Sequence, residues 1–246
     1  MQRPTIFTLL FSLGFVALAA IGAPARAGSA PPAAVGSKAT IDNPSGPKIE
    51  VAVEGPASEK TPLQVACVFE YVPGDISQPP ALPAAVNGML HLDRALQGLI
   101  SELRKSGRFE GHALETLLLT PPPKMIAAQR LLLVGLGDRS QFTPELMTRV
   151  GAIGMRAALE LGVDSYAHAS DLKDAGIDSP TRLVAQNVLR GALKAWHTQQ
   201  YLEQRAMAPH RSLRSVTLLA GPNFFAETQA AARELLAVAP APATGK

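Results

Sequence analysis

The chain has 246 residues, of which 47% are hydrophobic and 17% are charged, and its formal net charge is +3. A single cysteine, Cys67, excludes an internal disulfide and a thiolate metal cluster. Arg3 and Arg26 are the only charged side chains among the first 27 residues, which are expected to be removed as a signal peptide. The remaining chain has a formal charge of +1 (21 basic minus 20 acidic residues), which gives no electrostatic reason to expect binding to nucleic acid or to an anionic membrane.

The N-terminus has the three parts of a secretory signal peptide. Arg3 supplies the positive region, the segment 6–21 is apolar, and Ala25-Arg26-Ala27 fits the small-residue cleavage rule. We therefore expect residues 1–27 to be removed and the protein to be exported, to the periplasm or outside the cell. An uncleaved N-terminal anchor is the alternative, and no second apolar run reaches membrane length.

Two segments are predicted to be disordered. Residues 28–47 are rich in Pro, Gly, Ser and Ala, and residues 239–246, "APAPATGK", have the same character. Between them, residues 48–238 are long enough for one domain with its own core.

Strand and helix signals alternate through the first half of this domain. Residues 48–55 and 63–71 read as strands, and in the second of them Leu63, Val65, Cys67, Phe69 and Tyr71 share one face, which predicts a buried Cys67. Residues 84–105 have apolar side chains at helical spacing, with Gly107 just beyond. Residues 115–120 form a short strand that ends at three prolines.

The second half continues the alternation. Residues 130–135, "RLLLVG", are the most apolar strand and are predicted to be central. A helix capped by Thr143 is expected to run to Leu161 and to end at Gly162, followed by a strand in "DSYAHA", a helix over 180–206, a strand in "SVTLLAG" and a last helix over 223–238. This order predicts a three-layer α/β/α domain with a central mixed sheet.

The loop Gly135-Leu136-Gly137-Asp138 follows the apolar strand, where phosphate-binding loops often lie. A dinucleotide fingerprint requires a third glycine where Ser140 stands, and no P-loop Lys is present. A sharp turn that needs positive φ is therefore preferred. Ligand binding by Gly135, Gly137 and Asp138 is kept as a hypothesis.

Catalytic and metal motifs are not recognisable. The five histidines lack ligand spacing and are expected on the surface, no Gly-x-Ser-x-Gly occurs, and Asp171, Asp174 and Asp178 lack the Gly and Glu of a calcium loop. Trp196 and Tyr201 are expected to pack in the core. No catalytic residue, metal or cofactor is predicted.

Several ordered segments resemble the N-terminal domain of the leucyl aminopeptidase (cytosol aminopeptidase) family. They are "HLDRALQGLISELRKSGRFEGHALETLLLTPP", "IAAQRLLLVGLGD", "FTPELMTRVGAIGMRAALELGVDS" and "AQNVLRGALKAW", and the resemblance extends over residues 48–238. It implies a macro-domain-like fold with a role in assembly or regulation. In that family a separate C-terminal domain binds two metal ions and cleaves peptides, and its motifs do not occur here.

Three functions follow from the resemblance. The first is an exported, non-catalytic binding or regulatory module with a protein partner, either a peptidase or a second copy of the chain. The second is a macro-type module that binds a small molecule such as ADP-ribose or a nucleotide. The third is a subunit of a metal-dependent aminopeptidase. Nucleic acid is not expected as a partner, and neither is a membrane once the signal peptide has been cleaved.

Overall fold

The computed structural model describes residues 31–238, so the predicted signal peptide and C-terminal tail lie outside the described residues. Its centre is a seven-stranded mixed sheet in the order β1-β2-β7-β6-β3-β5-β4. The edge strands β1 and β4 run antiparallel to their neighbours, and the five inner strands are parallel. The strands are β1 (Lys38–Ile41), β2 (Lys48–Ala52), β3 (Gln64–Val68), β4 (Thr116–Leu119), β5 (Leu131–Gly135), β6 (Ser165–Ala169) and β7 (Ser215–Leu219).

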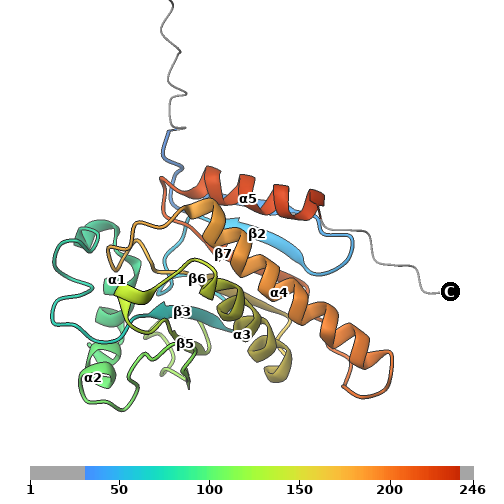
Figure 1. Cartoon of the computed structure of the whole chain (residues 1–246), viewed down its shortest axis with the longest axis horizontal. Helices are drawn as coiled ribbons and strands as arrows, with labels where there is room; N and C mark the ends of the chain where they lie inside the picture. The colour runs from blue at the N-terminus through green and yellow to red at the C-terminus, as the bar shows by residue number, and fades with distance from the viewer. Residues whose placement is uncertain (1–30, 239–246) are drawn as a thin grey trace, which may run out of the picture.

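Helices cover both faces of the sheet, so the fold is the expected three-layer α/β/α arrangement. One face packs against α3, α4 and α5, and the other packs against α1 and α2 (Figure 1). The helices are α1 (Gly88–Ala95), α2 (Leu99–Lys105), α3 (Leu146–Leu161), α4 (Thr181–Glu203) and α5 (Phe225–Val238), and the single turns η1 (Ala84–Val86) and η2 (Arg139–Gln141) complete the set.

Strand β3 shows why the inner strands are apolar throughout. Val65 and Cys67 point into the core beneath α3 and α4, whereas Ala66 and Val68 point into the core beneath α1 and α2. All five residues of β3 are buried, because successive side chains of a strand face opposite sides and both sides are covered here. The prediction that Cys67 is a buried strand residue is confirmed.

Helices α3 and α4 approach each other closely at two glycines. A Cβ atom at Gly191 would lie 1.8 Å from the carbonyl oxygen of Thr148, and one at Gly151 would lie 2.0 Å from that of Val188. Neither distance leaves room for a methyl group, so backbone-to-backbone contact fixes how the two helices cross.

Four expectations about the elements need correction. Residues 38–41 form β1 inside the segment predicted to be disordered, because their backbone extends the sheet beside β2. The helix expected over 84–105 is broken between α1 and α2, where Gly98 has φ +83°. Strand β5 is fully buried but lies next to the edge strand β4 rather than at the centre. Helix α3 has Glu145 as its N-cap residue, without a side-chain cap from Thr143.

Helix α3 does end as expected, at Gly162 in the left-handed conformation. Within residues 31–238, no helix combines the length and apolar character needed to cross a membrane.

Candidate functional site

A cavity of about 610 Å³ opens at the carboxyl ends of β2, β6 and β7. Its walls are the segments that follow these strands, together with the start of α1 and the first turns of α4 and α5. Ligands of open α/β sheets bind in crevices outside the carboxyl ends of the strands. We call it the strand-end cavity.

Two carboxylates of the β6–α4 segment line the cavity. Asp171 lies two residues after the end of β6 with φ +56°, and its Oδ2 accepts a hydrogen bond of 3.0 Å from the backbone N–H of Cys67. Asp174 Oδ2 accepts one of 2.9 Å from the N–H of Met89 in the first turn of α1. Each carboxylate is thus fixed by a backbone donor from another part of the fold.

Asn87 holds the same segment against α1. Its Nδ2 donates to the carbonyl oxygen of Asp174 over 2.9 Å, and its Oδ1 accepts from the N–H of Leu90 over 2.8 Å, which caps the helix. The side chain is completely buried. Asn87 therefore joins the start of α1 to the loop that carries both aspartates.

Burial is the main cause that raises the pKa of Asp171 and of Asp174 above the ordinary value. For Asp171 the neighbouring charge of Asp174 raises the pKa further, and the hydrogen bond from Cys67 opposes the rise. The pair therefore resists carrying two negative charges. A proton, or a ligand with a cationic or hydrogen-bond-donating group, relieves the repulsion.

His168 and Cys67 lie side by side beneath the cavity, with Nε2 and Sγ 4.0 Å apart. Burial lowers the pKa of His168 to about 4, so the imidazole is neutral at pH 7. Burial, followed by the charge of Asp171, raises the pKa of the Cys67 thiol. A neutral imidazole beside a protonated thiol does not form an activated nucleophile.

His168 also corrects an expectation, since all five histidines were expected at the surface. Its side chain is only 1% exposed, on the sheet face that packs against α3. The sequence held a signal for this, because residues 166 and 168 of a strand share a face and Tyr166 is a large apolar residue. His91, His112, His197 and His210 are exposed as predicted.

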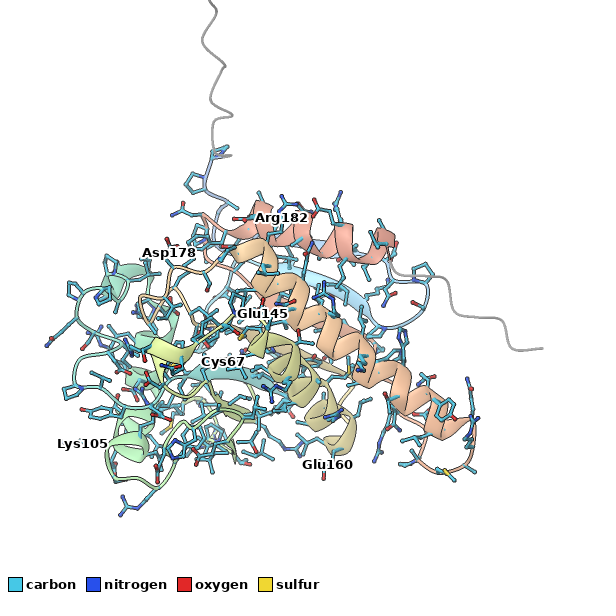
Figure 2. All side chains as sticks on the ribbon, in the orientation of Figure 1. Cys67, Lys105, Glu145, Glu160, Asp178 and Arg182 are labelled. Carbon is cyan, nitrogen blue, oxygen red and sulfur yellow. The ribbon has the colours of Figure 1, made fainter. Side chains whose placement is uncertain are left out.

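A buried hydroxyl and an ammonium group complete the wall on the side of α4. Ser179 Oγ is buried and has no hydrogen-bond partner within residues 31–238. Lys173 Nζ lies 2.5 Å from Asp178 Oδ1 and 5.6 Å from the centre of the Phe224 ring. The side chain of Asp178 is 98% exposed and does not line the cavity; the residue lies in the loop before α4 (Figure 2).

The predicted site residues Gly135, Gly137 and Asp138 do not line this cavity. A Cβ atom at Gly135 would lie 2.0 Å from the carbonyl oxygen of His112, so a passing chain requires glycine there. Gly137 has φ +78°, and Asp138 accepts a 2.8 Å hydrogen bond from the N–H of Ser140. The turn has a packing role, and ligand binding by these residues stays a prediction.

The next residue, Arg139, links that turn to the cavity. Its Nη2 lies 3.2 Å from Asp75 Oδ2, and its Nη1 donates over 3.4 Å to the carbonyl oxygen of Ala175, one residue after Asp174. Asp75 also binds Arg104, with Nη1 2.6 Å from Oδ2. Sequence reasoning missed this buried cluster because its members lie far apart in the chain.

Metal ligands are not assembled in the part of the chain that the structure describes. Within residues 31–238 no group of three or more His, Cys, Asp or Glu side chains is placed to hold a metal ion. The three aspartates of the β6–α4 segment diverge, since Asp171 binds Cys67, Asp174 binds α1 and Asp178 binds Lys173.

Comparison with curated proteins points to one family. Residues 77–204 match the sequence model described as the cytosol aminopeptidase family, N-terminal domain. A probable cytosol aminopeptidase of Roseiflexus castenholzii is 30% identical over 129 residues, which cover 52% of this chain and 26% of that protein. One from Geobacter sp. (strain M21) is 29% identical over 145 residues, 59% of this chain and 27% of that protein. The matches thus span about a quarter of these relatives' length.

Solved structures agree on the fold. A mutant of tomato leucine aminopeptidase superposes with a TM-score of 0.50 at 19% identity, covering 79% of this chain and 37% of that one. A mutant of the Oceanobacillus iheyensis macrodomain gives 0.52 at 16% identity, covering 82% and 98%. The same macrodomain with ADP gives 0.50 at 17% identity, covering 82% and 97%. With a macrodomain-like fold and more than half of its length matched, the chain belongs to the cytosol aminopeptidase family through that family's N-terminal domain.

Proposed function

We propose that this chain is a non-catalytic binding module whose ligand occupies the strand-end cavity. The observation that carries the proposal is the pair Asp171 and Asp174 in the wall of a 610 Å³ cavity. Each carboxylate uses Oδ2 to accept a backbone hydrogen bond. Within residues 31–238 no hydrogen bond reaches Asp171 Oδ1, so this oxygen is available to a ligand.

The chemistry of the wall favours a ligand with an amine or another strong donor at the aspartates. Such a group would neutralise part of the charge that burial makes costly. The apolar lining from α4, which includes Val184 and Val188, would contact the rest of the molecule. A small aliphatic amine or an amino acid amide has this combination of features.

Calorimetric titration of the protein with leucinamide tests this proposal. Binding should be measurable for the parent chain and lost for Asp171→Asn, because the amide replaces one carboxylate oxygen by a donor. Asp178→Asn is the matched control, since it changes the same residue type in the same segment but its side chain is 98% exposed. Equal binding of leucinamide by both variants, or no binding by the parent chain, would refute the proposal that the aspartates bind an amine.

A nucleotide-like ligand is the second candidate, and the fold comparison favours it. The Oceanobacillus iheyensis macrodomain was solved with ADP. In this chain the first turns of α4 and α5 border the strand-end cavity, and helix N-termini attract phosphate. Titration with ADP and ADP-ribose separates the candidates, because the two aspartates should repel these anions. Binding of ADP-ribose that Asp171→Asn strengthens would establish the nucleotide alternative.

Export and a role beside a peptidase remain parts of the same proposal. Export rests on the signal-peptide pattern of residues 1–27. It predicts a periplasmic or secreted product that begins at Gly28, which N-terminal sequencing after cell fractionation would detect. A product that begins at Met1 in the cytosol would contradict it.

The purified chain with Mn²⁺ or Zn²⁺ should not cleave leucyl-p-nitroanilide, and enzyme-like turnover would favour the aminopeptidase-subunit alternative.

A further inference from the structure

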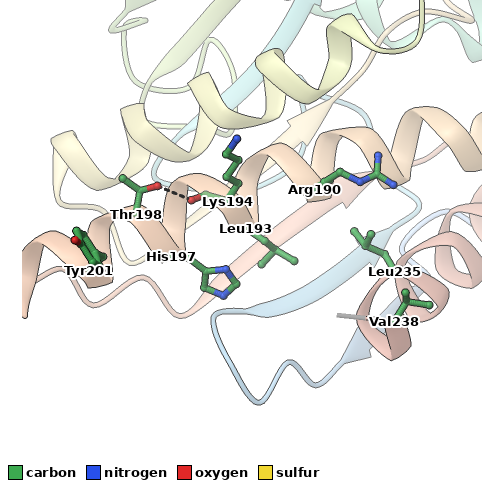
Figure 3. A pocket seen from close by; sticks show the side chains of 8 residues that line it. All are labelled: Arg190, Leu193, Lys194, His197, Thr198, Tyr201, Leu235 and Val238. Carbon is green, nitrogen blue, oxygen red and sulfur yellow. Dashed lines mark hydrogen bonds between the residues drawn. The ribbon is translucent and has the colours of Figure 1, made fainter. Parts of the chain in front are cut away.

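A second hollow lies on a different surface, along the second half of α4 and the end of α5 (Figure 3). Its volume is about 620 Å³, and we call it the α4 groove. It shares no residue with the strand-end cavity. Its lining comes from α4 between Arg190 and Tyr201 and from the end of α5, at Leu235 and Val238.

The polar part of the α4 groove is cationic. Arg190, Lys194 and His197 recur at spacings of four and three residues, so they follow one exposed side of α4. Residues 183–202 contain no Asp or Glu, and within residues 31–238 neither Arg190 nor Lys194 makes a salt bridge. The helix dipole favours cations in the last turn only, and Arg190 lies well before it.

The apolar part runs beside these cations. Leu193 is buried at the base, and Leu235 contributes from α5. Tyr201 and Val238 lie at the ends, with 53% and 82% of their surface exposed. Tyr201 thereby overturns the expectation that it packs in the core, whereas Trp196 is buried as predicted. Exposed apolar side chains next to an uncompensated row of cations are typical of an interaction surface.

We propose that the α4 groove binds an acidic amphipathic segment of a partner protein. Carboxylates of the segment would pair with Arg190 and Lys194, and its apolar side chains would cover Leu193, Leu235 and Tyr201. Arg205 extends the cationic row, since its guanidinium lies 3.7 Å from the centre of the Tyr201 ring. A helix or extended strand with Glu or Asp on one side and Leu or Val on the other has the complementary pattern.

Other occupants fit less well. Nucleic acid is held by many phosphate contacts, whereas this surface offers a few cations beside an apolar floor. The chain's own residues 239–246 contain no Asp or Glu. The inference is independent of the proposed ligand, because the α4 groove and the strand-end cavity are separate.

Selection of peptides from a random dodecapeptide phage library on the full chain tests the proposal. Peptides rich in Glu or Asp and in Leu or Val should be enriched, and the strongest should be synthesised and measured by fluorescence anisotropy. The double variant Arg190→Glu, Lys194→Glu should bind the synthesised peptide about tenfold or more weakly than the parent chain, because attraction becomes repulsion at two positions. Replacing each Glu of the peptide by Gln should weaken binding to the parent chain.

The control variant is Lys60→Glu with Lys105→Glu, which makes the same change in net charge at exposed sites. Lys105 lies on α2, at the far side of the molecule from the end of α4 (Figures 1 and 2). This control should bind the peptide like the parent chain, and both variants should keep the parent far-UV circular dichroism.

Four results would overturn the proposal. They are the absence of enrichment, enrichment without an acidic bias, equal binding by both charge-reversal variants, and stronger groove-dependent binding of a competitor than of the peptide. The competitors are a single-stranded dodecanucleotide and phosphatidylglycerol vesicles. A dimer in light scattering that dissociates only in the Arg190→Glu, Lys194→Glu variant would assign the groove to a second copy instead.

Discussion

Replacing Asp75 by Asn should destabilise the protein strongly, because it leaves Arg104 charged and buried. The side chain of Arg104 is 0% exposed and that of Asp75 is 3% exposed, and their ion pair measures 2.6 Å. Asp75 is also the partner of Arg139, whose side chain is 23% exposed and therefore reaches water. The loss thus falls mainly on Arg104, because within residues 31–238 its only other hydrogen-bond acceptor is the carbonyl oxygen of Phe69, which binds Nη1.

Breaking a buried ion pair by removing one partner costs about 3–5 kcal/mol, and the amide oxygen of Asn retains part of the hydrogen bonding, so we expect about 3 kcal/mol. That is a large share of a typical domain stability of about 5–15 kcal/mol. Urea denaturation followed by circular dichroism at pH 7 measures it. The midpoint should fall, and the slope should stay unchanged because the same surface is exposed on unfolding.

A double variant distinguishes the cost of leaving Arg104 without a charged partner from the cost of changing the packing at this site. Asp75→Leu with Arg104→Met removes both charges, so it should recover much of the loss, as apolar replacements of buried ion pairs do. Asp178→Asn removes one partner of the exposed Lys173 pair and should change stability little. The reasoning fails if Asp75→Asn is no more harmful than Asp178→Asn, or if the double variant is less stable than Asp75→Asn.

Three further predictions concern the cavity and the helix crossing. Burial lowers the pKa of His168 to about 4. A depressed histidine pKa means that the unfolded chain binds more protons, so His168 costs stability as pH falls from about 6.5 to 4. The free energy of unfolding of the parent chain, measured by urea denaturation relative to that of His168→Gln, should therefore fall by about 3 kcal/mol from pH 7 to pH 4. A difference in unfolding free energy that stays constant with pH would contradict a buried neutral imidazole. For Asp171 the sign is opposite, since burial and Asp174 raise its pKa and the folded state favours the protonated form. Stability from this group is present at low pH and is lost as pH rises, so Asp171→Asn should gain stability relative to the parent chain between pH 4 and pH 8 in thermal denaturation, and a relative loss would refute the assignment. Gly191→Ala should destabilise by about 2 kcal/mol or more, because the added methyl forces α3 and α4 apart. Gly55→Ala is its control, since the added Cβ would meet its nearest neighbour, Ser58 Oγ, at 3.5 Å, and equal midpoints in urea would show that the helices do not meet at Gly191.

Local patterns in the sequence were sufficient for most of the elements. Alternation in "LQVACVFEY" predicted β3 and the burial of Cys67, and the glycine after Leu161 marked the end of α3. Both features depend on residues within one element. The sequence pattern did not predict the break before α2, because the apolar residues keep their helical spacing on both sides of Gly98. The backbone nevertheless turns there, with φ +83° at Gly98.

The candidate site depends on contacts between distant parts of the chain, which is why the sequence did not reveal it. Asp171 binds the backbone of Cys67, 104 positions earlier, and Asp174 binds Met89, 85 positions earlier. In the sequence these aspartates belong to a polar loop with no ligand spacing. Their raised pKa values arise only when parallel strands β3 and β6 bring the loop against α1.

The loop after β5 combines a turn that the sequence predicts with a long-range contact, made by Arg139, that only the structure shows. Its glycines indicate a turn, and the structure needs them for close packing against residues 111–113. Arg139, the residue after this loop, binds Asp75 and the carbonyl oxygen of Ala175, which follows the cavity residue Asp174 in the chain. Arg139→Ala should therefore loosen the part of the cavity wall that carries Asp171 and Asp174, and leave the neighbouring strands unchanged. Hydrogen exchange should become faster in residues 171–177 and stay unchanged in β3, and equal protection in the variant would show that the turn after β5 does not support the site.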